Sequence, residues 1–182
     1  VTENDNNVDF DDKNILIAFF SRADENYGVG TIEKGNTHIL AEIIQEEVGG
    51  ELFHIERATP YPAVYSECTA EAQREKNANE RPALLQTKDI SEYDIIFIGY
   101  PIWWSDMPMP VYTFLESQNW NGKTVIPFST NEGSGLAGTV NTLNTKCAGA
   151  TILEALSMRG TTAQNNQTQA RQEITAWLTK IN

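Results

Sequence analysis

Short runs of apolar residues recur along the chain, each bounded by polar residues and separated by longer segments with helical spacing of apolar positions. The runs have the length of strands covered on both faces, and the longer segments have the period of amphipathic helices. The pattern predicts strands at residues 14–20, 52–56, 94–100, 124–129 and 151–158. Helices are predicted at residues 37–48, 63–79, 110–117, 136–147 and 163–181.

Strand and helix alternate five times in this prediction. Such alternation favours an α/β fold with a parallel sheet and helices on both faces, and right-handed crossovers limit its topologies. Pro127 lies inside the fourth predicted strand and argues mildly against a central position, because proline removes a ladder donor. Ligands of such sheets bind beyond the carboxyl ends of the strands, so the loops that follow the strands are the candidate site.

The chain has 182 residues, which fits a single domain. Its 13 Lys and Arg against 25 Asp and Glu give a net charge of −12. This charge repels nucleic-acid phosphate and anionic lipid surfaces, but it attracts a basic protein partner. No apolar run approaches the roughly 20 residues that cross a bilayer, so the sequence predicts a protein that does not span a membrane.

Residues 1–13 are polar and acidic, which predicts a flexible lead-in before a domain over residues 14–182. The first residue is Val1 rather than Met, as processing or the removal of a signal would leave it. We expect a cytoplasmic location, and the alternative is an exported or lipid-anchored precursor with the N-terminal signal removed. Cys68 and Cys147 match no metal or redox spacing and are expected to be unpaired thiols.

The loop after the first predicted strand combines hydroxyls with the start of a helix. Ser21 ends the strand, and Gly35-Asn36-Thr37 opens the helix. Free N–H groups at the positive end of a helix dipole bind phosphate, although ordinary capping by Asn36 or Thr37 accounts for the same residues. The loop lacks a P-loop motif, and Lys34 precedes the glycine. Neutral donors, with no fixed cation, are therefore expected to hold a phosphate.

The loops after the third and fourth predicted strands offer aromatic rings and glycines. The first of these contains Pro101-Ile102-Trp103-Trp104, where two bulky aromatics in a stiff backbone suit stacking on a planar ring, unless one of them packs in the core. The second is Thr130-Asn131-Glu132-Gly133-Ser134-Gly135, whose glycines permit close approach to a ligand or form a plain turn. All three loops fall on one edge of the predicted sheet, which favours a phosphorylated planar cofactor.

Other chemistries have little support in the sequence. His38 and His54 have no Cys, Asp or Glu at metal-ligand spacing around them, so no metal site is predicted. The string Gly133-Ser134-Gly135 lacks the GxSxG elbow of a serine nucleophile. No catalytic side chain is assigned.

At these loops the chain resembles the flavodoxin-like family, specifically a branch with a Ser-Arg first loop, a YPIWW second loop and a PFSTNEGSG third loop. The resemblance covers about residues 14–181. It implies a flavodoxin-like three-layer sandwich with a five-stranded parallel sheet in the order 2-1-3-4-5, the order known for flavodoxin itself, and FMN as cofactor. The implied cofactor-binding residues are Ser21, Gly35, Asn36, Thr37, Pro101, Ile102, Trp103, Trp104, Thr130, Asn131, Gly133, Ser134 and Gly135.

By this resemblance Ser21, Asn36 and Thr37 bind the FMN phosphate. Pro101 to Trp104 border the isoalloxazine, and Thr130 with Gly133 to Gly135 lines its far edge. The chain departs from short-chain flavodoxins in two places. Thirteen residues, 22–34, separate Ser21 from Gly35. The second loop also lacks the glycine that electron-shuttling flavodoxins often place beside the flavin, which leaves two-electron reduction of a small acceptor open.

The leading hypothesis is an FMN-binding redox protein in which the flavin does the chemistry and electrons pass to a redox partner protein that is basic at its docking face. The first alternative is an FMN-dependent NAD(P)H reductase of quinones or nitro compounds. The second is a binding or regulatory module without cofactor. The sequence leaves open whether the protein is an electron carrier or an enzyme.

Overall fold

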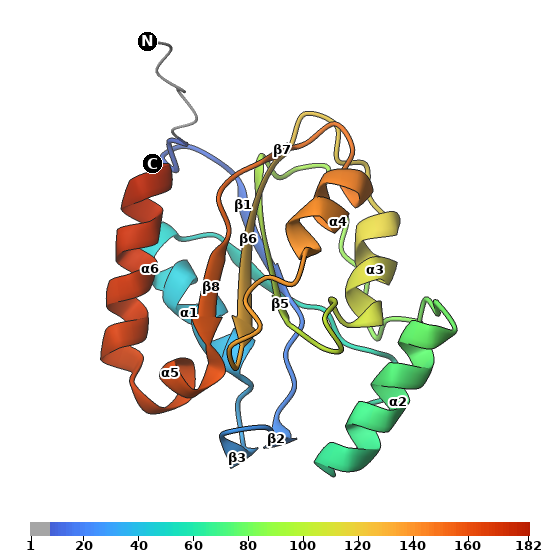
Figure 1. The fold of residues 1–182 in the computed structure, drawn as a ribbon. Helices are drawn as coiled ribbons and strands as arrows, with labels where there is room; N and C mark the ends of the chain where they lie inside the picture. Colours follow the sequence, from blue (N-terminus) through green and yellow to red (C-terminus); the bar gives the residue numbers. More distant parts are fainter. Residues whose placement is uncertain (1–7) are drawn as a thin grey trace.

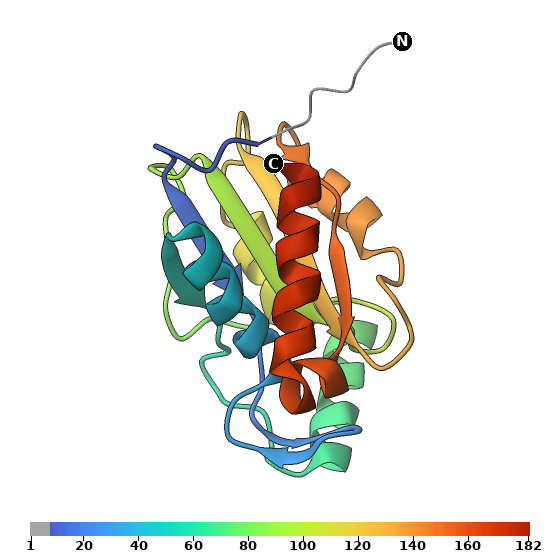
Figure 2. The same cartoon turned by 90° about the vertical axis from the view of Figure 1, so that its left-hand side faces the viewer.

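A parallel sheet runs through the middle of the protein, and helices cover both of its faces (Figures 1 and 2). The computed structural model describes residues 8–182. The sheet order is β4-β1-β5-β6-β7, and β8 continues beside β6 where β7 ends. These strands are β1 (Ile15–Phe19), β4 (Glu51–His54), β5 (Ile95–Pro101), β6 (Thr124–Asn131), β7 (Thr151–Ile152) and β8 (Leu156–Arg159). The predicted fold and the order 2-1-3-4-5 are confirmed, with the fifth strand divided in two.

The helices form the two outer layers. One layer contains α1 (Asn36–Val48), α5 (Gly160–Asn165) and α6 (Gln167–Ile181), and the other contains α3 (Met109–Glu116) and α4 (Thr139–Lys146). The closing segment was predicted as one helix, and this is wrong because the chain breaks at Asn166, where φ is −143° and ψ is 70°. The side chain of Asn166 accepts a hydrogen bond from the Gln169 backbone N–H and so caps α6.

Pro127 lies on a central strand, as the predicted order requires and despite the donor that proline lacks. The Val125 carbonyl accepts from the Leu153 N–H (2.9 Å), so Pro127, two residues on, faces the same neighbour. On that side pairing stops at Val125↔Ile152 and resumes at Phe128↔Leu156, with one extra residue in the partner strand. The irregularity falls where proline has no N–H to donate, so the sheet tolerates proline by breaking the neighbouring strand rather than β6.

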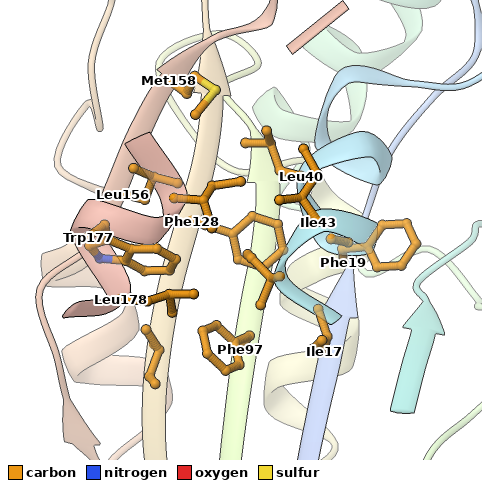
Figure 3. Packing of buried hydrophobic residues seen from close by; sticks show 14 of the residues in the cluster. Ile17, Phe19, Leu40, Ile43, Phe97, Phe128, Leu156, Met158, Trp177 and Leu178 are labelled. Atoms are coloured by element: carbon orange, nitrogen blue, oxygen red, sulfur yellow. The ribbon is translucent and has the colours of Figure 1, made fainter. Parts of the chain in front are cut away.

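The sheet is apolar along whole strands because both of its faces are buried. Ile15, Ile17 and Phe19 of β1 pack with residues of α1 and α6, whereas Leu16 and Ala18 face the layer that contains α3 and α4. Figure 3 shows the cluster on the side of α1 and α6, where aromatic and aliphatic side chains from the strands meet those of the helices. Burying each such large side chain stabilises the folded state by about 1.5–3 kcal/mol. This packing holds the strands in place, and with them the loops at their ends.

Residues 8–13 of the predicted lead-in pack against the domain. The Val8 N–H donates to the Ile181 carbonyl (2.9 Å), and the Phe10 ring stacks on Phe97 with centroids 6.0 Å apart. Residues 1–7, where a flexible lead-in was also predicted, lie outside the described residues. Within residues 8–182 no helix is long and apolar enough to cross a membrane.

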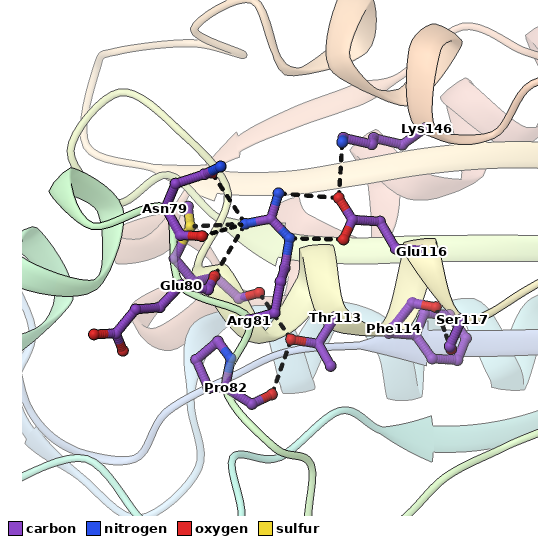
Figure 4. A network of polar contacts seen from close by, with 10 residues as sticks. Asn79, Glu80, Arg81, Pro82, Thr113, Phe114, Glu116, Ser117 and Lys146 are labelled. Carbon is purple, nitrogen blue, oxygen red and sulfur yellow. Dashed lines mark hydrogen bonds and ion pairs between the residues drawn. The ribbon is translucent and has the colours of Figure 1, made fainter.

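A polar network fixes α3, the helix that follows the second loop, to the rest of the molecule (Figure 4). The Arg81 guanidinium donates to both carboxylate oxygens of Glu116 (2.7 and 2.9 Å), and Lys146 Nζ donates to one of them (2.7 Å). These two cations lower the pKa of Glu116 to about 2. Thr113 on the same helix donates to the Pro82 carbonyl (2.8 Å), so two kinds of contact join α3 to the segment after α2.

The segment between Ser21 and Gly35 folds into a hairpin that the sequence analysis did not predict. Its strands are β2 (Asp24–Asn26) and β3 (Gly30–Ile32), which pair antiparallel. The hairpin and α2 (Tyr65–Asn77) lie together beyond the carboxyl ends of the sheet strands (Figure 1). The Glu25 N–H donates to the Ala63 carbonyl (3.3 Å), which ties the hairpin to the segment before α2.

Candidate functional site

A cavity of about 280 Å³ lies beyond the carboxyl ends of the strands, where the three loops meet. The first loop contributes one of the predicted residues, the second contributes all four, and the third contributes two. The predicted residues that line it are Asn36, Pro101, Ile102, Trp103, Trp104, Thr130 and Asn131. Loops that are up to about a hundred positions apart in the chain therefore share one cavity, as the parallel topology requires.

The other predicted residues lie around this cavity rather than in its wall. Ser21 and Gly35 line a neighbouring cavity of about 510 Å³. Thr37 is buried, and its hydroxyl lies 2.8 Å from that of Thr130, which joins the first loop to the third. Gly133, Ser134 and Gly135 line neither cavity. Cofactor contact stays a prediction for the whole set.

The first loop caps α1, but not through the Asn36 or Thr37 side chain, as the alternative interpretation of the sequence expected. Gly35 is the N-cap residue, and Asn36 is the first residue of the helix. Ser21 Oγ accepts from the His38 backbone N–H (3.1 Å), so Ser21 caps the helix from the preceding strand. Capping by the Asn36 or Thr37 side chain is therefore wrong, and neither residue is the N-cap.

Gly35 fits where a larger residue would not. A Cβ at this position would lie 2.0 Å from Ser21 Oγ and 2.7 Å from the Arg22 carbonyl oxygen. The backbone at the start of the inserted segment therefore runs directly against the start of α1, which explains why glycine precedes the helix.

The second loop makes a tight turn from Trp103 to Asp106. Trp103 and Asp106 exchange backbone hydrogen bonds (2.8 and 3.0 Å) across the turn. The two central residues, Trp104 and Ser105, have φ angles of 52° and 59°. This left-handed conformation is strained for residues with a side chain and costs of order 1–3 kcal/mol each. The glycine missing from this loop is thus replaced by strained backbone that the surrounding contacts hold in place.

The two tryptophan rings have different supports. Trp103 is packed against the edges of Phe20 and Tyr61, with centroids 5.1 and 5.2 Å away and ring planes at 83°. Trp104 is 45% exposed, and its indole N–H donates to the Thr69 carbonyl of α2 (2.9 Å). Trp103 is therefore a fixed wall of the cavity, whereas Trp104 lies at its mouth.

The rim of the third loop is organised by Asn131. Its Oδ1 accepts from the backbone N–H groups of Gly133 (2.8 Å) and Gly135 (3.2 Å). These contacts form a side-chain turn that keeps the two glycine donors directed at Asn131. Beside it, the Glu132 carboxylate accepts from the Thr161 backbone N–H (2.8 Å) and fixes the start of α5 to the loop.

Several lining residues were not predicted to contact a ligand. The hairpin and α2 supply most of them, and Arg22 and Glu132 were adjacent to predicted residues. The additional lining residues are Arg22, Asn26, Tyr27, Tyr65, Cys68, Thr69, Ala72 and Glu132. Burial raises the pKa of the Cys68 thiol to about 11, so this cysteine contributes packing rather than a nucleophile.

Two buried polar atoms in the cavity lining have no partner. Within residues 8–182 they are Asn36 Oδ1 and Arg22 Nε, an acceptor and a donor. Buried polar groups in folded proteins are almost always hydrogen-bonded, so a ligand with both acceptor and donor groups would satisfy this pair. A phosphorylated, hydroxylated cofactor has both. Arg22, a cation of the first loop, also lines this cavity, and the holding of a phosphate by neutral donors stays a prediction.

The parallel order and the cavity at its carboxyl edge define a flavodoxin-like α/β protein. The flavodoxin family model matches residues 14–181, so the chain belongs to the flavodoxin family. A search of the curated proteins gave no match.

Solved structures agree with this assignment. A candidate flavoprotein from Bacteroides eggerthii DSM 20697 is 31% identical, covering 93% of this chain and 98% of that one, with a TM-score of 0.71. A second from Bacteroides uniformis ATCC 8492 is 29% identical over 90% and 98% of the two chains, with a TM-score of 0.70. A flavoprotein in complex with FMN from Lactobacillus acidophilus NCFM is 21% identical over 86% and 99%, with a TM-score of 0.61, and shares the fold.

Proposed function

We propose that the protein binds FMN in the cavity between the three loops and acts as a redox protein. The observation that carries this proposal is the meeting of Asn36, Trp103 and Thr130 in one cavity whose lining includes an unpartnered acceptor and donor. FMN is the cofactor that membership of the flavodoxin family assigns. When bound, the flavin supplies the electron chemistry, and the chain supplies position, burial and charge.

Each loop has a distinct part in this proposal. The N–H groups at the start of α1, next to Asn36 and Thr37, lie at the positive end of the helix and suit the phosphate. Trp103 and Trp104 border the flavin ring, and Thr130 with Asn131 lines the far side of the cavity. Gly133 and Gly135 support that side from outside the cavity wall, because their N–H groups donate to Asn131 Oδ1.

We assign electron transfer to a basic partner protein as the leading role. The net charge of −12 favours encounter with a positive surface and disfavours anionic partners. A second role, direct reduction of a small aromatic acceptor, is favoured by Tyr27, Tyr65 and Trp104, which line the cavity and are 66%, 37% and 45% exposed. Uncharged rings at a cavity mouth suit a planar substrate as well as a protein.

Reconstitution with FMN tests the cofactor. The purified protein is expected to form a yellow complex with quenched flavin emission. Trp103→Ala is expected to weaken FMN binding by roughly threefold to tenfold, because an aromatic pair contributes about 0.5–1.5 kcal/mol beyond the buried area. Trp177→Phe, in the core on the other face, is the control with unchanged affinity. Absence of a complex would contradict FMN binding, and unchanged affinity in Trp103→Ala and Trp104→Ala would exclude stacking.

The electron-transfer role is tested with the reconstituted protein and a basic c-type cytochrome as acceptor. Its reduction is expected to slow as ionic strength rises, because salt screens the attraction between opposite charges. A rate indifferent to salt contradicts a charge-steered partner. Rapid steady-state oxidation of NAD(P)H by the protein alone, with a quinone as acceptor, would support the reductase instead. A potentiometric titration that counts electrons per step separates one-electron from two-electron use.

A further inference from the structure

Arg22 lies between the two cavities at the start of α1. It lines both of them, while Asn36 lines the first and Gly35 lines the second. The backbone N and O of Arg22 lie 2.9 and 2.7 Å from where a Cβ of residue 35 would be. Arg22 therefore borders the helix start at which the phosphate of a flavin is proposed to bind.

The guanidinium of Arg22 is held by neutral groups. Nη1 donates to the Glu25 carbonyl (2.5 Å), and Nη2 donates to the carbonyls of Pro62 (2.6 Å) and Ala63 (2.8 Å). Among residues 8–182 no carboxylate pairs with it, whereas Arg57, Arg81 and Arg171 each pair with glutamates. In a chain with 25 acidic against 13 basic residues, this is a fixed charge left without a counterion.

The third nitrogen of the guanidinium makes no hydrogen bond. Arg22 Nε is buried and has no hydrogen-bond partner in the described part of the chain. Arg22 as a whole is half-buried, and a charge partly withdrawn from water is costly unless it is paired and hydrogen-bonded; three carbonyl dipoles offset only part of that cost. An anion beside Nε would supply both the missing counterion and the missing hydrogen-bond acceptor. Arginine suits phosphate in particular, because its weakly hydrated guanidinium forms charge-assisted hydrogen bonds with phosphate oxygens.

We propose that Arg22 is the cation of the phosphate site and makes the protein select FMN over unphosphorylated riboflavin. This inference rests on the proposed binding of FMN. The phosphate monoester carries a charge of about −1.5 to −2 at neutral pH, whereas riboflavin presents only a hydroxyl at that position. Asn36 Oδ1, the unpartnered acceptor of a residue that lines the same cavity, would accept from a hydroxyl that both flavins share.

Arg22 also has a structural role that the test must separate from binding. Its contacts with Glu25, Pro62 and Ala63 join the hairpin to the segment before α2. If this were its whole contribution, replacing it would loosen the cavity wall for any flavin. The two roles therefore differ in whether affinity falls for FMN alone or for both flavins.

The experiment measures dissociation constants for FMN and riboflavin by flavin fluorescence, at low and high salt, in the wild type, Arg22→Gln and Arg22→Lys. Hydrogen bonds to charged groups contribute about 1.5–3 kcal/mol, so Arg22→Gln is expected to weaken FMN binding roughly tenfold to a hundredfold. Its riboflavin affinity is expected to stay within about twofold. Arg22→Lys keeps the charge and is expected to retain part of the preference and its salt dependence.

Glu25→Gln is the matched control for the hairpin. The Glu25 carboxylate accepts from the Tyr65 N–H (2.8 Å) and joins the hairpin to α2, yet it does not line the cavity. This variant is expected to keep the FMN preference of the wild type. An equal loss for both flavins in Arg22→Gln, or an unchanged FMN affinity, overturns the inference. If Arg22→Gln fails to fold, a wild-type preference for FMN over riboflavin that does not fall as the salt concentration rises overturns it. Failure of the wild type to bind either flavin refutes the proposed function itself.

Discussion

Replacing Glu75 by alanine is expected to lower the free energy of unfolding by about 3–5 kcal/mol. Glu75 lies on α2 and is only 2% exposed. One of its oxygens accepts from Arg57 Nη1 and the other from the Tyr61 hydroxyl, both at 2.5 Å. The substitution leaves the Arg57 guanidinium, whose side chain is 8% exposed, buried without this partner. Glu71 also contacts Arg57 (3.1 Å), which places the loss at the lower end of the range.

The measurement is urea unfolding of the wild type, Glu75→Ala and the control Glu67→Ala. Glu67 is exposed in the first turn of the same helix, where a carboxylate contributes only about 0.3–1 kcal/mol through the helix dipole. A loss in Glu75→Ala no greater than that of the control would contradict a buried network. Because Tyr61 packs edge-on against Trp103, Glu75→Ala is also expected to weaken FMN binding in the protein that remains folded.

The sheet was predictable because its strands are buried on both faces. Continuous apolar runs such as 14–20 and 94–100 leave few alternatives to a covered parallel strand. The order of the loops around one edge then follows from topology. The break between β7 and β8 beside Pro127, and the break between α5 and α6 at Asn166, were not predictable in the same way. Each depends on local hydrogen bonds, which cannot be inferred from the spacing of apolar residues.

The Glu75 network shows what sequence pattern leaves out. Residues 63–79 read as a polar, helix-favouring stretch, and in such a stretch a glutamate is normally solvated. Its burial depends on where α2 docks, which brings it to Arg57 and Tyr61 from the preceding segment. The same docking brings Cys68, Thr69 and Ala72 to the cavity. These residues share one helix face, but nothing in their spacing identifies the partner of that face.

The hairpin was missed because its strands are three residues long and largely exposed. No hydrophobic alternation marks such strands. Their stability comes instead from Arg22 and from the bonds of Asn26 Nδ2 to the carbonyls of Arg22 and Ala23 (3.1 and 3.0 Å). Trp103 and Asn36 were predicted at the site from their places after a strand and at the start of a helix, and both line the cavity.

Gly35→Ala is expected to weaken FMN binding by at least about tenfold, equivalent to roughly 1.4 kcal/mol. The added Cβ would lie 2.0 Å from Ser21 Oγ and within 3.0 Å of two backbone atoms of Arg22. A side-chain rotation can relieve the first contact, but only movement of the loop relieves the other two. That movement displaces the cap of α1, its free N–H groups and Arg22 together. Overpacking of this kind also costs about 1–3 kcal/mol of stability.

Gly49→Ala separates the two effects, because Gly49 caps the other end of the same helix. Its φ of 76° and ψ of −159° strain any other residue, while the space around it is open. Both variants should therefore unfold at lower urea, but only Gly35→Ala should lose FMN affinity in a fluorescence titration of folded protein. An FMN affinity unchanged from the wild type in both variants would mean that the phosphate does not lie at the start of α1. A loss in both would mean that FMN binding follows the stability of α1 rather than the geometry of its first turn.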